Sequence, residues 1–77
     1  MNKKRKTELS KIKDELERLQ GKIEDIQAEE QEAFDNMPES LQNSERGDTS
    51  SNAIDSMQSA YDMVHEAISC IEEITED

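Results

Sequence analysis

The sequence predicts an all-α protein, an antiparallel helical hairpin of the coiled-coil type that self-associates into a four-helix or larger bundle. Two runs of apolar residues alternate at spacings of three and four, which is the repeat of packed helices. The only proline, Pro38, lies between the two runs. With 77 residues, the chain is expected to form one domain over residues 1–77.

The first helix is expected over residues 4–36. Its apolar positions form a heptad seam, and Pro38 should end it because proline lacks an N–H and disfavours helical geometry in the residue before it. The seam consists of Leu9, Ile12, Leu16, Leu19, Ile23 and Ile26, and Glu30, Ala33 and Met37 continue its register.

A loop over residues 37–43 and a second helix over residues 44–75 follow. Ser44 is the preferred N-cap, with an acid directly after it to complement the helix dipole. Asp48, Thr49 and Ser51 are rival caps, and Gly47 favours one of these later starts. Starting at Ser44 gives two helices of similar length, each about 45 Å long at 1.5 Å per residue.

The second helix carries a wider apolar stripe than the first. Beside its heptad seam runs a second row, Ala53, Ala60, Ala67 and Ile74, so one partner helix cannot cover the whole stripe. A homo-oligomer, with a dimer as the simplest case, would bury the remainder. The predicted oligomer interface consists of Ile54, Met57, Ala60, Tyr61, Val64, Ala67, Ile68 and Ile71.

Charge divides the chain into unequal parts. Residues 1–22 hold eight cations and four acids, whereas residues 23–77 hold sixteen acids and one cation, Arg46, within a net charge of -11. An antiparallel hairpin brings the basic start of the first helix near the acidic end of the second. Such a surface favours a basic partner or head-to-tail pairing, or serves as a solvated surface.

No residue set in the sequence indicates catalysis. The chain has no nucleophile–His–carboxylate set, no glycine-rich phosphate loop and no metal-ligand spacing, so we predict no enzyme, no catalytic residues, no cofactor and no metal. Cys70 and His65 are each the only residue of their type. Acids close to Cys70 disfavour its thiolate. The basic N-terminus lacks a following apolar run, which predicts a cytoplasmic protein without a membrane segment.

Arg46 is the most informative single residue. In the first turn of the second helix its guanidinium opposes the helix dipole, so its presence needs a reason. One reading is an ion pair with Glu39, Glu45 or an acid of a neighbouring chain. Another is an anion or nucleotide site formed with Gln42 and Ser44. A third is a hot spot for protein contact.

The stretch "EEQEAFDNMPESLQNSERGDTSSNAIDSM" resembles a group of small acidic proteins from phages and prophages of low-GC Gram-positive bacteria. These proteins pair a heptad helix with a P-E-x-L-Q-x-S-E-R loop, and the resemblance covers residues 28–74. Gly47 and the polar residues after it depart from the group's pattern. The resemblance implies a viral context and makes the loop the candidate site. The positions that match are Pro38, Glu39, Leu41, Gln42, Ser44, Glu45 and Arg46.

Three functions follow as hypotheses. The first is a non-enzymatic phage protein that binds and inhibits a host protein, such as a defence or nucleic-acid-binding protein, through its acidic surface. The second is an oligomeric nucleotide sponge that uses the loop. The third is a structural or assembly subunit. We expect the chain to bind itself and a host protein, and to bind neither membranes nor nucleic acid directly.

Overall fold

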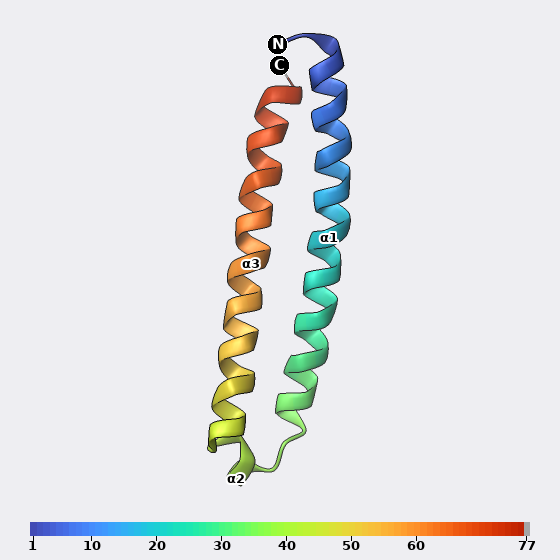
Figure 1. Cartoon of the computed structure of the whole chain (residues 1–77). Helices are drawn as coiled ribbons and strands as arrows, with labels where there is room; N and C mark the ends of the chain where they lie inside the picture. The colour runs from blue at the N-terminus through green and yellow to red at the C-terminus, as the bar shows by residue number, and fades with distance from the viewer. Residues whose placement is uncertain (77) are drawn as a thin grey trace.

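The computed structural model describes residues 1–76, and all of the regular secondary structure in that range is helical. Helix α1 spans Lys3–Asp35, the single turn α2 spans Glu39–Gln42, and α3 spans Glu45–Thr75. Figure 1 shows α1 and α3 side by side and antiparallel, with α2 at the opposite end of the rod from the start of α1. The Cα atoms extend over 58 × 14 × 13 Å. The chain is therefore a helical hairpin, and no strand occurs within residues 1–76.

Local capping explains where α1 begins and ends. The side chain of Asn2 accepts a hydrogen bond from the Arg5 N–H at 2.9 Å, which satisfies one donor of the first turn. At the other end Asn36 is the C-cap, two residues before Pro38, which itself is the N-cap of α2. Proline suits that position because it has no backbone N–H to leave unpaired.

One side of α3 packs against α1. The residues of its heptad seam are buried or half-buried there, with Ile68 only 4% exposed. Most of the predicted oligomer interface lies on this seam: Ile54, Met57, Tyr61, Val64, Ile68 and Ile71. These side chains therefore already have an intramolecular partner. Ala60 is half-buried and Ala67 is exposed, beside the seam. An interface between copies through this set stays a prediction.

The seam of α1 differs from the predicted one. Leu9, Leu16 and Ile23 are half-buried, but the other predicted row is turned outward, with Ile12 50% and Ile26 56% exposed. On the other side of Leu9, Leu16 and Ile23, a largely polar row faces α3 instead: Lys13, Gln20, Gln27 and Phe34.

Glutamine amides explain how that polar row is tolerated. Gln27 Nε2 donates to the Ile54 carbonyl oxygen at 3.2 Å, and Gln20 Nε2 donates to that of Tyr61 at 3.5 Å. Each amide reaches across to the backbone of α3 while the methylenes of the side chain pack beside the seam. These bonds also set the register of the two helices.

Candidate functional site

The loop is held by hydrogen bonds within the chain. Gln42 Nε2 donates to the Phe34 carbonyl oxygen at 2.9 Å and thereby ties α2 to the end of α1. Ser44 is the N-cap of α3: its hydroxyl donates to the Leu41 carbonyl oxygen at 2.5 Å and accepts from the Gly47 N–H at 3.5 Å. The polar groups of Gln42 and Ser44 thus fasten the loop.

Gly47 is the residue that lets α3 begin there. It is buried, and a Cβ at this position would lie 2.5 Å from the Leu41 carbonyl oxygen. Real Cβ atoms do not approach that closely, so α2 and the start of α3 can pack together only where a side chain is absent. The glycine that departs from the phage-protein pattern is therefore part of the tight turn.

The remaining candidate residues of the loop lie on the surface. Pro38, Glu39, Glu45 and Arg46 are all exposed, and Leu41 is 39% exposed. Within residues 1–76 Arg46 forms no ion pair, so the expected pairing with Glu39 or Glu45 is not found there. The structure brings together Gln42, Ser44 and Gly47 as a backbone lock, and leaves Arg46 outside it.

Arg46 instead lines an open hollow of about 420 Å³ between the two long helices. On one wall are Glu30, Ala33 and Met37, and on the other are Arg46, Thr49, Ser50 and Ala53. The Ser50 hydroxyl, whose residue is 5% exposed, donates to Glu30 Oε1 at 2.6 Å.

This arrangement disfavours a phosphate at the hollow. The Glu30 carboxylate on its wall repels an anion, and the Ser50 hydroxyl is already donating to it. The Thr49 hydroxyl donates to the Glu45 carbonyl oxygen at 3.0 Å and is used as well. Only Arg46 is left to attract an anion.

Glu30 and Ser50 were missed as a pair in the sequence, although a signal for them exists. Glu30 falls in the heptad register of α1, and Ser50 lies seven residues before Met57 in that of α3. Two polar residues in otherwise apolar rows, at opposite sides of one turn, indicate a hydrogen bond across the seam.

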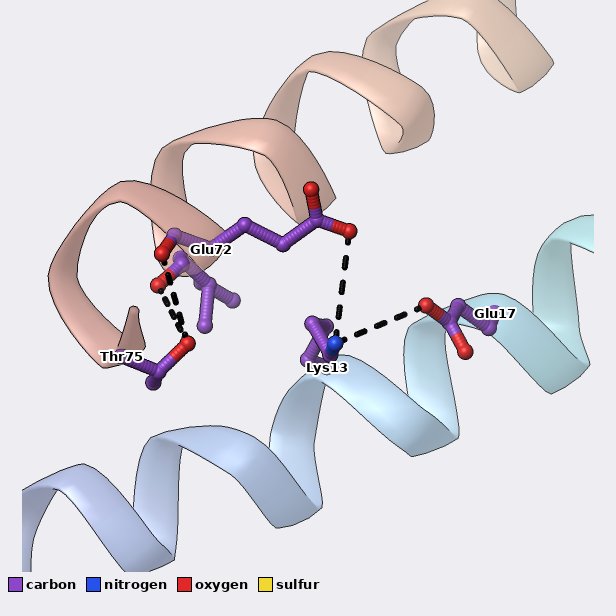
Figure 2. A network of polar contacts seen from close by, with 5 residues as sticks. Lys13, Glu17, Glu72 and Thr75 are labelled. Atoms are coloured by element: carbon purple, nitrogen blue, oxygen red, sulfur yellow. Dashed lines mark hydrogen bonds and ion pairs between the residues drawn. The ribbon is translucent and has the colours of Figure 1, made fainter. Parts of the chain in front are cut away.

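A polar side of the hairpin carries the one ion pair that joins the two helices within residues 1–76. Figure 2 shows Lys13 of α1 between Glu17, also of α1, and Glu72 of α3. The Lys13 Nζ atom lies 4.0 Å from a carboxylate oxygen of each. On the same side the Gln27 amide donates to Gln58 Oε1 at 3.0 Å. The Lys13–Glu72 and Gln27–Gln58 contacts join α1 to α3, and such partly exposed contacts contribute little stability singly.

Few titratable groups are perturbed. A hydrogen bond from Arg18 holds the pKa of the Glu15 carboxyl below its ordinary value, and the same contact raises the pKa of Arg18. The negative charge of Glu24, with lesser contributions from desolvation and from Asp62, raises the pKa of Tyr61.

No three His, Cys, Asp or Glu side chains of residues 1–76 converge in a way that could hold a metal ion.

Residues 1–76 contain no helix that is long and apolar enough to cross a bilayer. Comparisons of the chain with protein-family models, with curated proteins and with solved structures give no match.

Proposed function

We propose that the chain is a non-enzymatic, self-associating helical hairpin of phage type that binds a host protein through its acidic surface and inhibits it in the host cytoplasm. The supporting observation is uncompensated charge. Ion pairs within residues 1–76 engage only three acids, Glu15, Glu17 and Glu72. None of the twelve acids from Glu24 to Glu66 takes part in an ion pair with another of the described residues.

A hairpin whose residues 23–77 hold sixteen acids and one cation attracts a basic partner surface from a distance and repels an acidic one. Because the carboxylates are carried on two packed helices, their spacing is set before binding, which lowers the entropic cost of association. A protein surface that normally binds nucleic acid is such a partner. Its association with the hairpin should weaken steeply as salt is added.

The test is capture of host proteins by two charge-matched variants. One carries Asp55→Asn, Asp62→Asn and Glu66→Gln on α3, where all three residues are exposed. The control carries Glu8→Gln, Asp14→Asn and Glu17→Gln, which removes the same charge from the basic third of the chain. We expect the first variant to lose the partner and the control to retain it. Equal capture by the native chain and both variants would exclude an electrostatic partner site on α3.

A nucleotide sponge is the weaker alternative, because Gln42 and Ser44 are engaged within the chain and Glu30 lines the hollow beside Arg46. A ligand present at a hundred times its dissociation constant stabilises a protein by roughly 2.7 kcal/mol. A panel of linear and cyclic nucleotides in a thermal-shift assay therefore decides the matter. A thermal shift that Arg46→Ala abolishes would favour the nucleotide sponge over the first proposal.

The third alternative, a structural or assembly subunit, predicts open, polydisperse assemblies in sedimentation.

A further inference from the structure

One long side of the hairpin is apolar along its length. It consists of two rows of apolar residues, and within each row the residues are seven positions apart. We call the two rows together the apolar face. The α1 row is Ile12, Leu19, Ile26 and Ala33, and the α3 row is Ala53, Ala60, Ala67 and Ile74. Both rows lie on the same side, because Ala33 and Ala53 line opposite walls of one hollow. The Lys13–Glu72 and Gln27–Gln58 contacts lie on the other side.

We propose that a second copy of the chain covers the apolar face, with the two hairpins packed head to tail so that their loops lie at opposite ends of a four-helix bundle. This inference rests on the self-association proposed above and names its surface and orientation. In this arrangement α1 packs antiparallel on α1 of the other copy, and α3 on α3.

The size of the face fits such a partner. One long side of a rod of 58 × 14 Å offers about 800 Å², which is about the area that each protein contributes to an interface of standard size. Leu19, 39% exposed, lies between the half-exposed Ile12 and Ile26 on the α1 row. Single exposed apolar residues need no explanation, but a continuous row of this length does.

Charge selects the head-to-tail orientation. The loop half of the hairpin, residues 23–60, holds ten acids and one arginine, a net charge of -9, while the other half holds eight cations and ten acids, a net charge of -2. With loops at the same end, the two strongly acidic halves would face each other. Head to tail, each acidic half faces the half that contains all the lysines. Like charges thus stay apart.

The register of the rows fits a twofold axis at mid-rod. Pairing Leu19 with Ile26 of the other copy brings Ile12 level with the other copy's Ala33, so a large side chain faces a small one. The Gln20–Tyr61 bond places Ala60 at the level of the middle of α1. Ala60 then lies at the axis against its own copy, where a methyl group allows close backbone approach.

The same register accounts for the hollow and for the lone cation of the loop. Ile12 of the other copy comes level with Ala33 and enters the hollow. Arg46 comes level with Ile74 of the other copy, at the acidic end of that copy's α3. An acid of that end would give Arg46 the ion pair that it lacks within residues 1–76.

Matched alanine variants test the surface by sedimentation equilibrium and circular dichroism. Ala67→Asp places a carboxylate on the apolar face, and Ala28→Asp makes the same change on α1 away from it, where the side chain is also exposed. We expect a native dimer, a dimer for Ala28→Asp, and a dissociation constant at least about 100-fold higher for Ala67→Asp, because its carboxylate would be buried without a counter-charge.

Orientation is tested in a Cys70→Ser background, which removes the only cysteine. Oxidation of Ala60→Cys should give a covalent dimer, whereas Ser40→Cys, at the loop, should give none because the loops are at opposite ends. A native monomer would overturn the proposed self-association and this inference with it. A native dimer that tolerates Ala67→Asp, or that is cross-linked by Ser40→Cys and not by Ala60→Cys, would overturn this inference alone.

Discussion

Gly47 packs directly against the Gln42 carbonyl group, at a distance that leaves no room for a side chain. The contact exists because α3 turns back within two residues of α2. Gly21 is the opposite case, since a Cβ there would meet no atom within 4 Å. The two glycines form a matched pair for measuring what the tight turn requires.

We expect Gly47→Ala to destabilise the fold by roughly 2 kcal/mol or more, because the added carbon overlaps backbone atoms that cannot move without opening the turn. Gly21→Ala should instead stabilise it by about 1 kcal/mol, the difference in helix propensity between the two residues. Urea unfolding followed by circular dichroism measures both. Equal effects of the two substitutions would show that α2 moves easily to make room for a side chain at position 47.

Ser50→Ala should cost about 1 kcal/mol. It removes the hydroxyl that donates to Glu30 and leaves a half-buried carboxylate oxygen without that donor. Ser56, exposed on the same helix, is the control, and Ser56→Ala should be neutral or slightly stabilising. The measurement is the free energy of unfolding of the two variants. A neutral Ser50→Ala would mean that water replaces the hydroxyl.

Ile68→Ala should lower the free energy of unfolding by about 2–4 kcal/mol, since Ile68 is 4% exposed and truncation leaves a cavity in the seam. Met63 is 68% exposed on the same helix, so Met63→Ala should change stability by less than about 0.5 kcal/mol. Thermal melts of both variants at one protein concentration provide the comparison. Similar losses would place the stabilising contacts outside the α1–α3 seam.

Tyr61 should titrate with a pKa above its ordinary value, because the Glu24 carboxylate disfavours a second negative charge nearby. The chain has a single tyrosine and no tryptophan, so tyrosinate absorbance reports this residue alone. Glu24→Gln should bring the pKa back toward normal, and Glu32→Gln should not.

The sign of the effect on stability follows from the same shift. The unfolded chain loses the tyrosine proton first, so stability falls as pH rises from the ordinary tyrosine pKa through the raised one. Glu24→Gln should reduce this loss. A pKa that is identical in the native protein and in Glu24→Gln would contradict the proximity of Glu24 and Tyr61.

Arg46→Ala should leave the melting temperature of the monomeric hairpin nearly unchanged, because Arg46 is exposed and forms no ion pair within residues 1–76. The substitution should instead weaken the affinity for another chain. An arginine that anchors an acid of another chain is worth roughly 2 kcal/mol of binding, and Arg46→Lys should restore only part of it, since lysine lacks the planar fork. Loss of melting temperature without loss of affinity would make Arg46 a fastener of the loop.

By itself, the sequence determined the helical hairpin. Spacings of three and four predict two packed helices, Pro38 marks where the first must end, and the predicted bounds of 4–36 and 44–75 lie within one residue of Lys3–Asp35 and of Glu45–Thr75 with its cap at Ser44. These features are local: helical periodicity, capping and the geometry of proline act within a few residues of the chain.

Only the tertiary structure decided which side of α1 faces α3. Ile12 and Lys13 lie on opposite flanks of the central row of leucines, about 100° apart around the helix axis at 3.6 residues per turn. Hydrophobicity alone predicts that the row of Ile12 faces α3, yet in the structure the row of Lys13 faces α3. The reason is non-local: Gln20 and Gln27 find carbonyl groups on α3, and Glu30 finds the Ser50 hydroxyl. Those partners exist only once the two helices have met, and their pairing is what leaves the isoleucine row exposed.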